Sequence, residues 1–293
     1  MNKDRITGFH VVFFIFVVSN VGGCLTPIGD PPLFMGYLKG VPFWWTAEHL
    51  WQGWALALAL LLVVFYLTDR ANFLRAPKAV RIKETARETW GFRGLHNVFF
   101  IGLILFAVLK LPMWWRELLM LVAAMGSWFS TKRDIHQAND FSFAPLKEVA
   151  WLFIGIFATM VPALQYLQAS PPPLAGAGAF YWATGVLSSL LDNAPTYLAF
   201  LATALGAQQL ALDSPSDVAI FAKTHVETLR GISLGAVLFG AMTYIGNGPN
   251  FMVKAIAEHS KVPMPTFVGY VVRFALPILL PVLAIVWLVL FWR

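Results

Sequence analysis

The chain has little charge and almost no cysteine, and each scarcity excludes a class of protein. Only 12% of its 293 residues are charged, whereas 58% are hydrophobic and the mean hydropathy is +0.68. Soluble globular domains carry about 25% charged residues, so this composition excludes an ordinary soluble domain. Cys24 is the only cysteine, which excludes an intramolecular disulfide and a cysteine-based metal site.

Motifs of enzymatic chemistry are missing as well. The sequence has no Ser/His/Asp set and no metal-spaced histidines, and its Gly-x-Gly at Gly246–Gly248 lies inside an apolar run rather than in a phosphate-binding loop. We therefore predict a protein that is not an enzyme and has no cofactor. The net charge of +6 comes from basic residues gathered between apolar runs, as the positive-inside rule places them, so we expect membrane lipids and no nucleic acid as partners.

Long apolar runs are abundant. Leu50–Thr68, Val149–Leu167, Gly231–Val253 and Phe274–Trp292 each match the roughly 20 residues that cross a hydrocarbon core. The fold class that we predict is an all-α polytopic membrane protein. The segment Asp69–Arg93 holds an excess of arginine and lysine, which predicts a cytoplasmic position and, for the whole protein, the cell inner membrane.

An acid lies in the middle of one apolar region. Between Glu148 and Asp213 the only carboxylate is Asp192, and a charge at the centre of a bilayer costs several kcal/mol unless it faces protein, water or a cation. Pro195 predicts a helix break nearby, because proline removes a backbone hydrogen bond. The surrounding Ala175–Ala207 is too long for one crossing and too short for two, which predicts a re-entrant hairpin with Asp192 near its tip.

Two further interruptions fall inside apolar sequence. Ser19–Pro32 holds three glycines and three prolines, which predicts a discontinuous transmembrane helix; the alternative is a surface loop. Gly246–Asn250 repeats the pattern. Counting crossings from the basic segment makes the two broken helices antiparallel, as an inverted-repeat secondary transporter requires, with the site between them.

The other segments complete the predicted topology. Leu95–Leu109 and Leu118–Ser130 are expected to form an antiparallel pair, and Phe267–Trp292 a final span kinked at Pro277 and Pro281. We expect four regions: the first discontinuous helix (1–48), intervening scaffold helices (49–174), the hairpin with the second discontinuous helix (175–262), and the last span (263–293).

Three ordered motifs, Ser19–Pro31, Leu187–Thr196 and Ile245–Met252, together resemble the ion transporter superfamily, and within it the NhaD-type sodium/proton antiporters and their citrate-transporter-like (CitMHS-like) relatives. Asn139–Phe157 is similar to the segment before that family's outer hairpin. The resemblance implies an elevator-type carrier that forms a homodimer. The family also has an inner hairpin upstream of the first broken helix, which implies that this chain is the C-terminal portion of a longer carrier, a truncated product, or one partner of a chain that supplies the missing N-terminal half.

We expect sodium/proton antiport in which Asp192 and Asp30 are the competing cation and proton sites. Burial favours the protonated carboxyl and a bound sodium ion favours the ionised one, so the two ions exclude each other. Oxygen ligands suit such an ion, and the tentative sodium ligands are Asp192, Asn20 and Asn247. The wider binding set is completed by Asn193, Thr196, Ser188, Gly22, Thr26 and Asn250.

Two other functions stay open. One is import of a citrate-like carboxylate coupled to protons or sodium, in which Ser188, Thr26 and half-helix N-termini hold the anion. Two acids in mid-membrane repel a polyanion, which favours cation exchange. The other is a non-transporting membrane scaffold or truncated remnant, although a scaffold gains nothing from buried acids beside broken helices.

Overall fold

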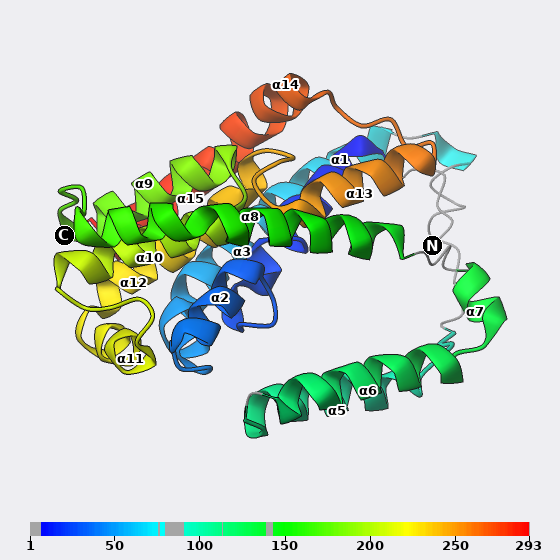
Figure 1. The fold of residues 1–293 in the computed structure, drawn as a ribbon. Coiled ribbons are helices and arrows are strands. Elements are labelled where there is room, and N and C mark those ends of the chain that lie inside the picture. Colours follow the sequence, from blue (N-terminus) through cyan, green and yellow to red (C-terminus); the bar gives the residue numbers. More distant parts are fainter. Residues whose placement is uncertain (1–6, 76, 80–90, 113, 139–142, 293) are drawn as a thin grey trace. The chain divides into compact units, whose positions relative to one another are not determined.

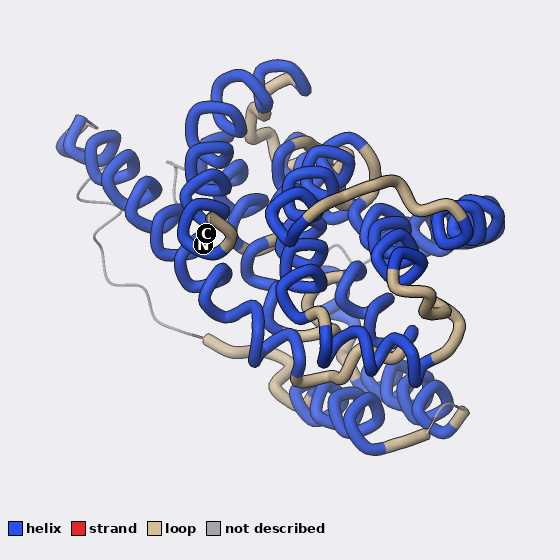
Figure 2. Tube along the Cα trace, turned by 90° about the vertical axis from the view of Figure 1, so that its left-hand side faces the viewer, coloured by secondary structure: helices blue, strands red, loops and turns tan. Residues whose placement is uncertain are grey.

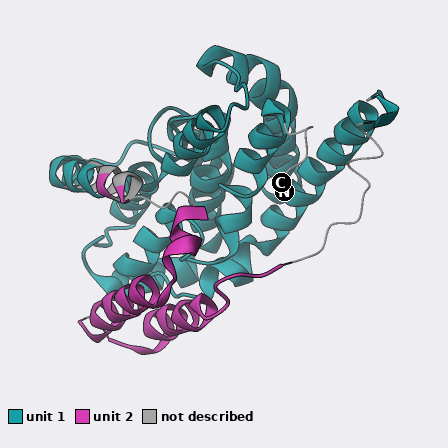
Figure 3. Cartoon of the chain, turned by 90° about the vertical axis from the view of Figure 1, so that its right-hand side faces the viewer, with its two compact units in different colours: residues 1–84, 149–293 teal, residues 85–148 magenta. Residues whose placement is uncertain are grey.

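A computed structural model describes residues 7–75, 77–79, 91–112, 114–138 and 143–292. These residues form helices joined by short connections and include no strand (Figures 1 and 2), which confirms the predicted all-α polytopic class. Among them, Gly8–Leu25, Trp45–Arg75 and Phe267–Leu290 are long and apolar enough to cross a membrane. The chain divides into two compact units, Met1–Glu84 with Val149–Arg293, and Thr85–Glu148 (Figure 3).

The first unit contains both discontinuous helices that the sequence predicts. In the first, α1 (Gly8–Val17) is followed by a 3-10 turn (Val21–Leu25) and then by α2 (Pro31–Lys39). In the second, α12 (Val226–Phe239) leads through a 3-10 turn at Gly240–Met242 to α13 (Gly248–His259). Helix α1 packs on α13, while α12 packs on α2. Since the first half of each helix meets the second half of the other, the two helices run antiparallel.

A helical hairpin packs against both of them. It consists of α9 (Gly176–Leu190) and α10 (Asn193–Ala207), and it turns at the predicted Asp192. Helix α10 contacts α2, and α9 lies along α12. The α9–α12 contact is close and parallel, because Gly231 and Gly235 lie against the carbonyl oxygens of Ala177 and Tyr181, respectively.

Helices α2, α10 and α13 begin in the same way. Each has an N-cap residue with a carboxylate or amide side chain, namely Asp30, Asp192 and Asn247, followed by a proline within three residues. Proline is tolerated in the first helical turn, where its missing N–H would have no intrahelical acceptor. The prolines therefore end the unwound stretches and fix where each second half starts.

Other helices contact parts of this assembly. The last span changes its winding: α14 continues into a π-helical stretch around Pro277 and then into α15. The bounds are α3 (Trp45–Arg75), α8 (Ala144–Ala169), α11 (Pro215–Thr224), α14 (Phe267–Tyr270), the π-helix (Val271–Leu279) and α15 (Leu280–Leu290).

The second unit contains the predicted antiparallel pair. The helices are α5 (Asn97–Lys110) and α6 (Trp115–Ser130). The Ser127 hydroxyl near the end of α6 donates to Asn97 Oδ1 at the start of α5 at 2.7 Å, so the two helices run antiparallel. The short α7 (Arg133–Ala138) follows. About half of the basic segment predicted to be cytoplasmic, at 76 and 80–90, and the start of the family-like stretch, at 139–142, lie outside the described residues.

Candidate functional site

The starts of α2, α10 and α13 converge on one buried cluster. Asn193, the first residue of α10, donates from Nδ2 to Asp30 Oδ1 at 3.0 Å. Its backbone N–H donates to the carbonyl oxygen of Gly246 at 3.1 Å, next to the N-cap Asn247. Because a helix start carries a partial positive charge, three such charges point into the place where Asp30 lies.

Three oxygen atoms of this cluster have no hydrogen-bond donor. They are Asp30 Oδ2, Asn193 Oδ1 and Asn247 Oδ1, on side chains that are at most 1% exposed. Buried polar atoms almost always have a partner, and each unsatisfied one costs about 1–3 kcal/mol. One carboxylate oxygen and two amide oxygens are the hard ligands that an alkali or alkaline-earth cation prefers. The arrangement is therefore suited to hold a cation.

An amide network adjoins these oxygens and joins the two discontinuous helices. Asn20 donates to Asn250 Oδ1 at 2.8 Å and accepts from Asn247 Nδ2 at 3.0 Å. Gly240 lies between this network and the hairpin: a Cβ there would be 3.0 Å from Asn20 Oδ1 and 3.2 Å from Asn193 Nδ2. The network and the acid cluster are therefore parts of one site.

Asp192 occupies a different position from Asp30. It is half-buried, and its Oδ1 accepts the backbone N–H of Ala194 at 3.0 Å, as an N-cap does. Thr196 donates to the Asp192 carbonyl at 2.9 Å. Of the two acids singled out from the sequence, Asp30 is the one whose side chain is fully enclosed in the cluster.

The remaining predicted residues surround the cluster at different depths. Ser188 is buried and donates to the carbonyl oxygen of Ala236 at 2.7 Å. Thr26 is half-buried and its carbonyl accepts from Gly29 N in a turn, while Gly22 is exposed and so lies outside the buried cluster. The structure thus brings together Asp30, Asn193, Asn247, Asn20 and Asn250.

A family model described as "Putative citrate transport" (CitMHS_2) matches residues 1–291. The chain belongs to this family. The match agrees with the citrate-transporter-like resemblance, and with the apolar helices it makes the chain a membrane protein of a citrate-type transport family. The match does not test whether the protein is an NhaD-type antiporter, whether the chain is part of a longer carrier, or whether it lies in the inner membrane. These three stay predictions. No curated protein and no solved structure gives a match to the chain.

One residue that stabilises this site, Thr243, was not predicted from the sequence. The Thr243 hydroxyl donates to the carbonyl oxygen of Ser189 at 2.6 Å and accepts the backbone N–H groups of Ile245 and Gly246 at 3.2 and 3.1 Å. It thereby ties the end of α9 to the second break. The sequence feature that could have predicted this role is a threonine three residues before Gly246-Asn247-Gly248. Backbone N–H groups of an unwound stretch need hydrogen-bond acceptors, and a nearby hydroxyl can provide one.

Replacing Thr243 by valine is expected to destabilise the protein by about 2 kcal/mol or more, because valine keeps the shape but leaves two backbone N–H groups without an acceptor. Thermal unfolding of the purified protein in detergent measures this. Thr243→Ser retains the hydroxyl and serves as the control. Equal unfolding temperatures for the valine and serine variants would show that these hydrogen bonds do not stabilise the break.

Proposed function

We propose that this protein is a cation-coupled transporter of citrate-like carboxylates, and that Asp30 binds the coupling cation, with sodium as the first candidate. The observation that supports it is the set of three buried oxygens without donors on Asp30, Asn193 and Asn247. Membership of a family whose description names citrate transport supports citrate-like carboxylates as the substrate class. Placement in the cell inner membrane and assembly as a homodimer are parts of the same proposal.

The helix starts provide a coupling mechanism. While its site is empty, the Asp30 carboxylate offsets the partial positive charges of α2, α10 and α13. A bound cation neutralises Asp30, and the helix ends then attract the carboxylates of the substrate. Pro31 and Pro32 have no N–H, so α2 contributes mainly its field rather than direct hydrogen bonds. Cation binding therefore precedes and strengthens substrate binding.

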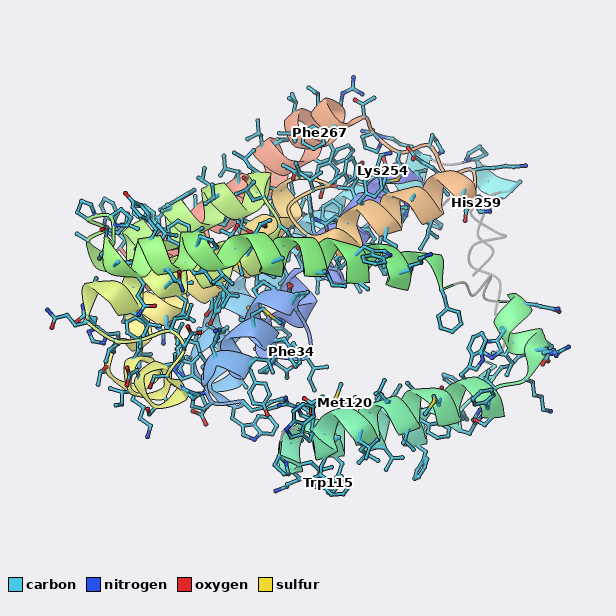
Figure 4. The ribbon with its side chains drawn as sticks, in the orientation of Figure 1. Phe34, Trp115, Met120, Lys254, His259 and Phe267 are labelled. Carbon is cyan, nitrogen blue, oxygen red and sulfur yellow. The ribbon has the colours of Figure 1, made fainter. Side chains whose placement is uncertain are left out.

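Sodium/proton antiport, with Asp192 and Asp30 as competing sites, is the second candidate. The observation that favours it is that both ionisable side chains at these helix starts are acids. Lys254 on α13 (Figure 4) is paired with Glu258 at 2.8 Å, so its charge is already offset. The acids provide a counter-charge for a sodium ion directly. An anionic substrate would find no basic side chain among the described residues at these helix starts, and would need a bound cation as its counter-charge.

Reconstitution in proteoliposomes distinguishes the candidates. We expect radiolabelled citrate to accumulate inside vesicles when a sodium gradient is directed inward, and not when choline replaces sodium. A pH-sensitive dye enclosed in the same vesicles reports sodium/proton exchange in the absence of citrate. Sodium-driven pH change without citrate uptake would replace the proposal by antiport, and the absence of both fluxes would favour the scaffold.

A further inference from the structure

The amide network at the crossing of the two discontinuous helices uses every one of its N–H groups. Asn20 Nδ2 donates to the carbonyl oxygen of Ile15 as well as to Asn250, both at 2.8 Å. Asn250 Nδ2 donates to the carbonyl oxygens of Gly240 and Thr243 at 2.8 and 2.9 Å. These acceptors belong to the unwound stretches or the adjacent helix end, so the two asparagines fasten both breaks to each other.

The oxygens of the network are not equivalent. Asn20 Oδ1 accepts from Asn247, and Asn250 Oδ1 accepts from Asn20. Only Asn247 Oδ1 is left without a donor. The sequence predicts Asn20 and Asn247 as sodium ligands and Asn250 as part of the wider binding set, but the side-chain oxygens of Asn20 and Asn250 are engaged within the network.

The orientation of the Asn247 amide follows from its two acceptors. Its Nδ2 donates to Asn20 Oδ1 at 3.0 Å and to the carbonyl oxygen of Ser19 at 3.2 Å. If the amide were turned over, its oxygen would face these two acceptors and lose both hydrogen bonds. Asn20 therefore holds the Asn247 oxygen on the side away from the network. Asn250 in turn fixes Asn20.

We propose that Asn20, supported by Asn250, is a positioning residue that orients the Asn247 carbonyl oxygen toward the bound cation and is not itself a ligand. This inference rests on the proposed cation site at Asp30. It assigns different roles to residues of one type: Asn247 and Asn193 supply oxygens that lack donors, while Asn20 and Asn250 supply the hydrogen bonds that hold one of those oxygens in place.

A double-mutant cycle on Asn20→Ala and Asn247→Ala tests the inference. The readout is the sodium concentration that raises the unfolding temperature of the purified protein by a fixed amount, with choline as the replacing cation, because this concentration scales with the dissociation constant for sodium. We expect each single variant to raise this concentration about 10-fold, because partners that orient a ligand affect metal affinity by this order. The double variant should raise it no further, since Asn20 acts through Asn247.

The control is Asn97→Ala, which removes an asparagine that is hydrogen-bonded to Ser127 and Thr131 in the second unit. It should lower the unfolding temperature without changing the sodium concentration. If Asn20→Ala does not fold, Asn20→Leu takes its place in the cycle, because leucine is close to asparagine in size but has no oxygen that could accept from Asn247.

The outcomes separate the inference from the proposed function. An unchanged sodium concentration in the Asn20 variant, or effects that multiply to about 100-fold in the double variant, would overturn the positioning role while leaving the cation site intact. A wild-type protein whose unfolding temperature does not respond to sodium, lithium or potassium would overturn the cation site, and with it both proposals.

Discussion

Replacing Asp30 by asparagine is expected to reduce sodium-dependent citrate uptake by about 100-fold at subsaturating sodium, the factor that corresponds to about 3 kcal/mol of lost interaction with a charged ligand. Asparagine has nearly the same shape and keeps an oxygen that Asn193 Nδ2 reaches at 3.0 Å in the wild type. The substitution removes the negative charge and leaves the packing. Initial rates in proteoliposomes over a range of sodium concentrations measure the effect.

Asp192→Asn is the matched control. Asparagine is as good an N-cap as aspartate, so the bond to the Ala194 N–H at α10 is retained, and we expect a change of about 3-fold or less. The reverse pattern, with Asp192→Asn inactive and Asp30→Asn active, would refute the assignment of the cation to Asp30. It would favour the emphasis on Asp192 that the sequence alone suggests.

Replacing Gly246 by alanine is expected to abolish transport and to destabilise the fold by about 2 kcal/mol or more, as overpacking of a close contact does. A Cβ at this position would lie 2.6 Å from the carbonyl oxygen of Gly240 and 2.8 Å from that of Ser188. Both obstacles are backbone atoms, so neither yields by rotating a side chain. The shift would also separate Gly246 O from Asn193 N, the bond that joins α10 to the start of α13.

Gly248→Ala, two residues along the chain, provides the comparison. A Cβ at Gly248 has no heavy atom within 4 Å, and alanine suits the first turn of α13, so this variant should fold and transport like the wild type or be slightly more stable. Size-exclusion profiles and unfolding temperatures in detergent measure both variants. If Gly246→Ala behaves like Gly248→Ala, the close packing of the second break against the hairpin is not essential.

The positions of the breaks could be predicted from sequence, whereas the roles of the polar residues in them could not. Glycine and proline act locally, so the first unwound stretch and the turn at Asp192 lie where the sequence predicts them. The second break begins earlier than predicted, at Gly240, and α13 already starts at Gly248, because proline is tolerated in a first helical turn. Whether an acid is enclosed or only caps a helix depends on what packs over it. Asp30 is enclosed because Asn193, 163 positions away, lies beside it.

The amides show the same limit in finer detail. Asn20, Asn247 and Asn250 have the same side chain, and the different roles proposed for them follow from hydrogen bonds that span 227 and 230 positions. Thr243 was missed for a related reason, since its hydroxyl bonds to Ser189, 54 positions away. Composition and spacing carry no information on which lone pair remains free.

If Asp30 binds the coupling cation as proposed, the convergence of α2, α10 and α13 would also restrict leakage of the cation. Three helix starts amount to about 1.5 positive elementary charges, which one ionised acid offsets in large part. A cation bound to Asp30 without an anionic substrate would restore that excess and make movement through a low-dielectric interior costly. A bound carboxylate substrate would reduce that excess, so in the proposed mechanism the electrostatics that attract the substrate would also suppress slippage of the cation alone.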